Sequence, residues 1–109
     1  MTLDQIAAWF KNEPESLRTF IGFQQRCYAE IASAGDQAVY LRLLGRMAGR
    51  LADQIEGEPI AVEVVEAAHR QLASLTEQAI EASKKPAAEQ LAIINKLARL
   101  ELQDARELA

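Results

Sequence analysis

The sequence predicts an all-α protein. Along most of the chain, large apolar residues recur at intervals of three and four, which is the spacing of one face of an α-helix. The three prolines stand where this pattern restarts, and Gly35 and Gly57 stand where it stops. Glu63 and Glu66 interrupt the only cluster of β-branched residues, at 62–65, so no strand is expected.

The first two helices are predicted from a capping box and a proline. Thr2 and Gln5 have capping-box spacing, so a short helix is expected over residues 3–11. Pro14 is expected to start a second helix, over residues 14–34. Backbone N–H groups in the first turn of a helix have no hydrogen-bond partner within the helix, so proline, which lacks this group, is tolerated there.

Three longer helices fill the rest of the chain. Asp36 is expected to cap a helix over residues 37–56, with Gly57 in the left-handed conformation just after its end. Two further helices, each starting at a proline, follow over residues 59–83 and 86–108. Short connections between long helices force antiparallel neighbours. The second to fifth helices are therefore expected to form an up-down-up-down four-helix bundle, with the short N-terminal helix across one end.

Two glycines lie inside the third predicted helix. Gly45 and Gly49 are four residues apart and therefore share one face. A glycine inside a helix costs up to about 1 kcal/mol relative to alanine. We therefore expect another helix of the same chain to pack closely against this face.

Length and composition point to a single domain over residues 1–109. Half of the residues are hydrophobic, and 12 Lys and Arg against 16 Asp and Glu give a net charge of -4. There is no run of about 18 apolar residues, so no membrane span is expected. The single cysteine, Cys27, cannot form an internal disulfide, and the first residues, Asp4 among them, lack the pattern of a secretory signal. We therefore expect a cytoplasmic protein.

The fifth predicted helix carries more apolar surface than one core requires. One stripe, expected to face the core, contains Leu91, Ile94, Ala98 and Ala105. A second stripe contains Ile93, Leu97 and Leu100. Monomers rarely expose such a row of large aliphatic side chains, so the second stripe is predicted to contact another chain, most simply a copy of itself in a homo-oligomer. The alternative is that both stripes are internal.

Trp9 is a further candidate contact residue. Together with Phe10 it gives the first helix an aromatic end. Either Phe10 closes the bundle while Trp9 lies at its rim, or the first helix docks into the groove of a partner protein.

Glu66 and His69 are the candidate metal ligands. Their Glu-x-x-His spacing places a carboxylate and an imidazole one turn apart, and it resembles the motif of ferritin-like di-iron bundles. That family uses two such motifs and two further glutamates, so Glu30 and a second copy of the chain would be needed to complete a site. The alternative is a partly exposed histidine that binds nothing.

Arg42, Arg46 and Arg50 are the candidate nucleic-acid-binding residues. They are spaced by four and form a basic line on the third predicted helix. Surfaces that bind nucleic acid usually carry more cations on a basic domain, whereas this chain is acidic. Pairing with Asp53, or with glutamates of neighbouring helices, is the expected role, and weak nucleic-acid binding is the alternative.

No catalytic motif is recognisable. Cys27 lies beside an apolar line without a cation one turn away to stabilise its thiolate, and the chain has no Gly-rich phosphate loop. We expect neither enzyme activity nor a cofactor. The sequence favours a non-enzymatic helical module for protein–protein interaction, self-associating or acting as an adaptor, with the metal site and the nucleic-acid surface as alternatives.

Overall fold

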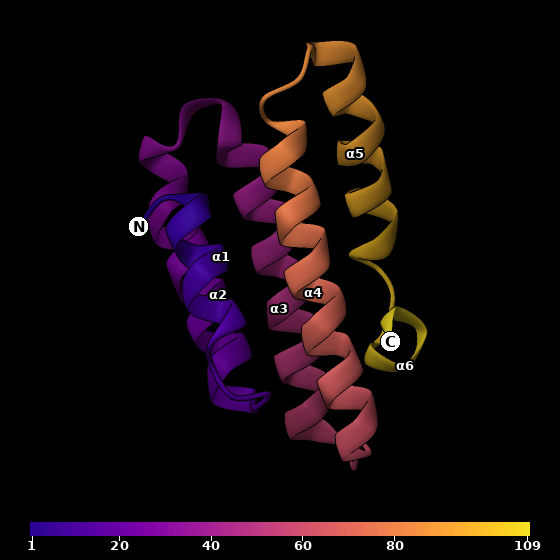
Figure 1. The fold of residues 1–109 in the computed structure, drawn as a ribbon. Helices are drawn as coiled ribbons and strands as arrows, with labels where there is room; N and C mark the ends of the chain where they lie inside the picture. The colour runs from indigo at the N-terminus through magenta and orange to yellow at the C-terminus, as the bar shows by residue number, and fades with distance from the viewer.

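The N-terminal half of the chain forms three helices that pack along one another. In the computed structural model, which describes residues 1–109, α1 (Leu3–Lys11) lies beside α2 (Leu17–Glu30), and α2 packs along α3 (Ala38–Gly57) (Figure 1). Two short 3-10 turns, Ile31–Ser33 and Gly35–Gln37, connect α2 to α3. The second and third helices therefore form an antiparallel pair, as expected.

The C-terminal half adds α4 (Val62–Ala82), α5 (Ala87–Leu100) and the single-turn α6 (Ala105–Leu108). The α4 helix packs against α1 and α3, and α5 lies on α3 and α4, away from α1 and α2 (Figure 1). The all-α prediction is confirmed, since the chain contains no strand. None of these helices is long and apolar enough to cross a membrane.

The position of α1 differs from the prediction. It runs along α2 and α4 instead of lying across one end of the bundle, and α5 takes the outer position (Figure 1). The reason lies in the side chains of α1, because Leu3, Ile6 and Phe10 are all fully buried. A nine-residue helix with such a face needs apolar neighbours along its whole length.

The core is one connected cluster of 23 buried residues. Phe10 of α1 lies near its centre, with its ring centroid 4.7 Å from that of Phe23 and 6.0 Å from that of Phe20. Edge-on and tilted contacts of this kind are the favoured arrangements of aromatic rings. They tie α1 directly to α2.

The glycines of α3 allow α2 to approach closely, as predicted. A Cβ atom added at Gly45 would lie 2.7 Å from Cε1 of Tyr28 and 3.2 Å from Cβ of Cys27. At Gly49 the added atom would collide with the side-chain amide of Gln24. The α2 side chains therefore rest directly on the α3 backbone.

Several helix ends differ from the prediction. The α2 helix begins after Ser16, whose hydroxyl accepts a hydrogen bond from the Thr19 amide at 3.4 Å, so Pro14 lies in the preceding turn. Asp36 lies in a 3-10 turn and does not cap α3, whose N-cap, Gln37, makes no side-chain cap. The left-handed glycine is Gly35, at φ 57°.

The end of α3 has a different cause from the one expected. Gly57 is its last helical residue and does not have a positive φ. The next residue, Glu58, is extended at φ -150° and ψ 157°, and it precedes Pro59. A residue before proline is forced out of the helical region, so Pro59 ends α3. The α4 helix then begins only at Val62.

The last predicted helix is divided in two. It breaks after Leu100, and Asp104 caps α6 in a capping box with Glu107. The Ala105 amide at this break donates to Oε1 of Gln54 on α3. The cap and this contact turn the C-terminal segment back onto the bundle.

Candidate functional site

The two apolar stripes of α5 are only partly oriented as predicted, since Ala105 of the expected core stripe is fully buried and Ile94 is half-buried against the core. Leu97 is fully buried, and Ile93 and Leu100 are half-buried against the core. Leu91 is 56% exposed, and Ala98 is also exposed. The predicted contact of Ile93, Leu97 and Leu100 with another chain is therefore wrong for Leu97, because no part of that side chain reaches the surface.

Two polar contacts fix this orientation of α5. Near the start of the helix, the Tyr40 hydroxyl of α3 donates to Oε1 of Gln90 at 2.9 Å. Burial raises the pKa of Tyr40, so the hydroxyl keeps the proton that it donates. Just after the helix, the Arg46 guanidinium donates to the carboxylate of Glu101 at 2.9 Å. The two acceptors, Gln90 and Glu101, lie on the same side of this segment as Leu97.

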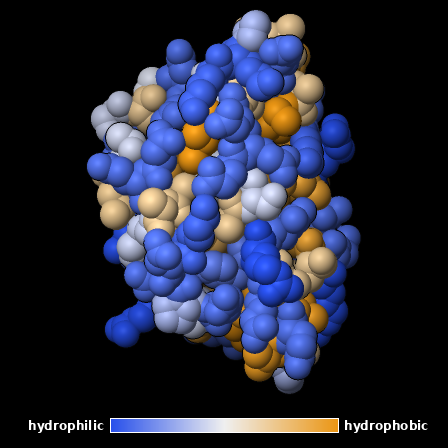
Figure 2. All heavy atoms as spheres, viewed as in Figure 1, coloured by the Kyte–Doolittle hydropathy of each residue, from blue (hydrophilic) through white to orange (hydrophobic).

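The outward stripe of α5 borders a groove. Ala87, Leu91, Ile94 and Ala98 follow one another at intervals of four, three and four, and none is charged. Leu91 and Ile94 join Val39 of α3 in lining a groove of about 490 Å³. Figure 2 shows apolar surface along the side of the molecule where Figure 1 places α5, between larger polar areas. We call the four residues Ala87, Leu91, Ile94 and Ala98 the α5 seam; Ile94 is half-buried and the other three are exposed.

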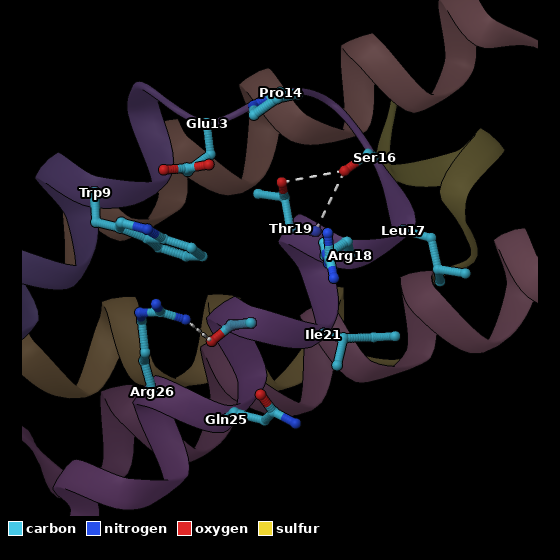
Figure 3. Close-up of a pocket in the computed structure, with 11 residues that line it drawn as sticks. Trp9, Glu13, Pro14, Ser16, Leu17, Arg18, Thr19, Ile21, Gln25 and Arg26 are labelled. Carbon is cyan, nitrogen blue, oxygen red and sulfur yellow. Dashed lines mark hydrogen bonds between the residues drawn. The ribbon is translucent and has the colours of Figure 1, made fainter.

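Trp9 lies at the edge of a second groove, of about 770 Å³, between α1 and α2 (Figure 3). The guanidinium of Arg26 lies 3.9 Å from the centre of the Trp9 ring, and its Nη1 donates to the Gly22 carbonyl at 3.2 Å. Phe10 is buried and Trp9 is half-buried, as expected for a residue at a rim. The stacked pair joins α1 to α2, so one face of Trp9 is already covered.

The arginine line is largely engaged with the C-terminal segment. Arg46 pairs with Glu101, which raises the pKa of the Arg46 guanidinium, and Arg50 donates to the Leu102 carbonyl at 3.3 Å. Arg42 is exposed, with no ion pair. The expected pairing with a glutamate of a neighbouring helix segment is thus found at Arg46. Arg46 and Arg50, two of the three arginines proposed to bind nucleic acid, therefore contact the C-terminal segment of this chain.

The three candidate metal ligands do not come together. No three His, Cys, Asp or Glu side chains are close enough to hold a metal ion. The carboxylate of Glu30 binds the N-terminal amine at 3.1 Å and accepts from the Ser33 hydroxyl, whereas His69 packs against phenyl rings. Glu66, half-buried, has no hydrogen-bond partner. Sequence spacing placed Glu66 and His69 on one helix but did not show that His69 faces the core.

Cys27 is buried beside the backbone of α3. Burial raises the pKa of its thiol to about 12, so the thiolate is scarce at neutral pH. The position agrees with the expected place of Cys27 beside an apolar line.

Glu101 is the residue whose role the sequence reasoning missed. Its side chain is only 7% exposed and is held by Arg46. The signal was present, because Glu101 follows Leu97 by four residues and therefore shares its face.

No protein family matches this chain, and it shows no significant similarity to any curated protein sequence or solved structure.

Proposed function

We propose that this protein is a non-enzymatic helical interaction module that pairs with a second copy of itself through the α5 seam. The main support is the exposure of Leu91, at 56%, in the middle of an uncharged stripe. Exposed apolar side chains that follow one another along a helix are a feature of contact surfaces. The α5 seam lies beside the buried face of Leu97 and shares Ile94 with the edge of that face.

The spacing of the α5 seam fits another helix. Intervals of four, three and four are those of the residues by which two helices interlock in a coiled coil. Alanine at the two ends, Ala87 and Ala98, allows a partner helix to come close, while Leu91 and Ile94 supply the larger contacts. Val39 of α3 widens the apolar surface beside them.

Charge favours a second copy over a highly charged partner. The chain carries a net charge of -4, so two copies repel each other unless their contact lies away from charged groups. The four residues of the α5 seam are uncharged, and Asp36 is the one charged residue that lines the groove beside them. A two-fold pair uses the same patch on both chains, which makes it the commonest form of self-association.

The test is the oligomeric mass of the full chain, measured by light scattering and sedimentation at micromolar concentration. We expect the wild type to form a dimer and Leu91→Glu to be a folded monomer with the helical circular-dichroism spectrum of the wild type. The matched control is Val62→Glu, which places the same charge at an exposed residue in the first turn of α4, where a carboxylate is favoured. This control remains a dimer.

Two results contradict the proposal. One is a wild type that stays monomeric throughout the micromolar range. The other is a dimer that survives Leu91→Glu, which would place the contact on another face.

A further inference from the structure

His69 occupies an unusual place for the only histidine of the chain. It is 4% exposed, and its ring lies 4.0 Å from that of Phe10, nearly parallel at 17°. The ring of Phe20 contacts it edge-on at 6.1 Å. The Nε2 atom is buried and has no hydrogen-bond partner. A polar atom left in this condition inside a protein needs an explanation.

The neutral imidazole fits this site and the protonated one does not. A neutral ring stacks on Phe10 as another aromatic group would. A protonated ring brings a charge and a second N–H donor into the same apolar surroundings, where Nε2 finds no acceptor. Accordingly, burial lowers the pKa of His69, although Glu15 and the backbone of Phe10 act in the opposite direction.

The charged groups near this site come from three elements. The α1 helix contributes Asp4 and Lys11, and Lys11 is engaged with Glu77 at 3.6 Å. The connection between α1 and α2 contributes Glu15, the start of α2 contributes Arg18, and α4 itself contributes Glu66 and Arg70. Among them, Glu15 is the carboxylate that favours the protonated ring, and the burial of His69 outweighs it.

The α1 helix is the element that depends on this contact. Its buried apolar face carries Phe10, the residue stacked on His69, and the other attachments of α1 are the Trp9–Arg26 stack and the exposed Lys11–Glu77 ion pair. Its start is capped by its own residues, Thr2 and Gln5, so it can leave the bundle without losing that cap. A short turn connects it to α2.

We propose that acidification releases α1 from α2 and α4, because a protonated His69 cannot remain stacked under Phe10. The released helix uncovers the apolar surface formed by Phe20, Phe23 and His69 itself. The device is therefore a pH-operated lid on the core.

The direction of the effect follows from proton linkage. The unfolded value for histidine is 6.5, and the folded value lies below it. The contribution of His69 to stability is therefore complete above pH 6.5 and is lost as the pH falls from there toward the folded pKa. Below the folded pKa it changes no further.

Amide hydrogen exchange in the full chain tests the lid. Opening of α1 is followed at the Ile6 and Phe10 amides, and global opening at Leu44 of α3, between about pH 7.5 and 5, with correction for intrinsic exchange. We expect the α1 opening constant of the wild type to rise by up to about tenfold per pH unit below the unfolded pKa, with Leu44 unaffected. Trp9, the only tryptophan, reports the same event by fluorescence.

His69→Phe provides the decisive comparison, since it keeps an aromatic ring against Phe10 and removes the titrating group. The acid-dependent opening of α1 disappears in this variant. If it folds poorly, His69→Gln is used, because the amide is polar and does not titrate. The proposal fails if the variant keeps the pH dependence of the wild type, or if α1 and α3 open together at every pH.

Discussion

The α2–α3 contact and the attachment of α5 represent two ways of holding a helix. Along α2 and α3, Gly45 and Gly49 bring the two helices so close that Tyr28 and Gln24 lie on the backbone of α3. On α5, Leu97 is the only fully buried side chain among 14 residues, and Gln90 within the helix and Glu101 just after it make specific polar contacts.

The difference teaches where this molecule can interact. The close α2–α3 contact leaves little apolar surface free between these two helices, because Tyr28 and Gln24 fill the space beside the α3 glycines. The α5 helix is held along one edge by Leu97 and two polar groups, so its opposite edge, with Leu91, remains open. Helices that are held along one edge are the ones with a face to offer a partner.

The largest expected effect is at Leu97. Leu97→Ala removes the only fully buried side chain of α5 and leaves a cavity, so we expect the free energy of unfolding to fall by about 3 kcal/mol. Urea unfolding followed by circular dichroism measures the loss.

Leu91→Ala is the matched control for Leu97→Ala on the same helix. Its side chain is mostly exposed, so at a protein concentration too low for dimerisation we expect a change below about 0.5 kcal/mol. Equal losses at both positions would show that the two faces of α5 are not as different as described.

The next effect is at Gly45. Gly45→Ala places a methyl group against the Tyr28 ring and Cβ of Cys27, and the latter is too near the backbone to move aside. Overpacking costs about 1–3 kcal/mol, and the gain in helix propensity returns up to about 1 kcal/mol, so we expect a net loss of about 1–2 kcal/mol.

Gly49→Ala shows how much of the loss at Gly45 comes from overpacking, because the gain in helix propensity is the same at both positions. The new methyl group there meets only the amide end of Gln24, which is flexible. We therefore expect a smaller loss than at Gly45, below about 1 kcal/mol. The reverse order in urea unfolding would contradict the close packing of Cys27 on Gly45.

Local signals predicted much of the fold. The capping box of Thr2 and Gln5 placed the first helix at the residues observed, and Gly45 and Gly49 correctly indicated a close helix contact. The arrangement of helices was not predictable in this way. Loop length makes neighbours antiparallel, but it does not decide whether α1 or α5 takes the inner position.

The orientation of α5, and with it the candidate site, could not be predicted from the sequence either. Ile93 and Leu97 on one stripe, and Leu91 and Ile94 on the other, all obey helical spacing, so periodicity found both stripes without ranking them. The choice depends on contacts with distant residues, such as Tyr40 with Gln90. Pairings of that kind are set by tertiary packing, which a single helix pattern does not contain.

A smaller effect is expected at the Arg46–Glu101 pair. Arg46→Met leaves the buried carboxylate of Glu101 without its cation, so α5 is held less firmly, although water can approach because Arg46 is half-exposed. Hydrogen exchange of the α5 amides should accelerate while that of α2 does not. Arg42→Met is the control, since Arg42 makes no ion pair and its loss changes neither helix.

A double variant sharpens this test of the ion pair. Arg46→Met combined with Glu101→Leu removes both charges, and an apolar pair can replace a buried ion pair at little cost. We expect the double variant to recover the slow α5 exchange that Arg46→Met loses. No recovery would mean that Arg46 acts through something other than the charge of Glu101.

The most local effect is expected at the end of the chain. Asp104→Ala removes the side-chain oxygen that accepts from the Glu107 amide at 2.9 Å, so the capping box of α6 is lost. Loss of such a cap costs about 1 kcal/mol, and here it falls on a helix of four residues that carries the buried Leu108. Exchange at the Leu108 amide should accelerate, while α2 and α3 keep their exchange rates. If α3 also accelerated, the turn at Asp104 would be supporting the closely packed part of the molecule, and the contrast between its two regions would disappear.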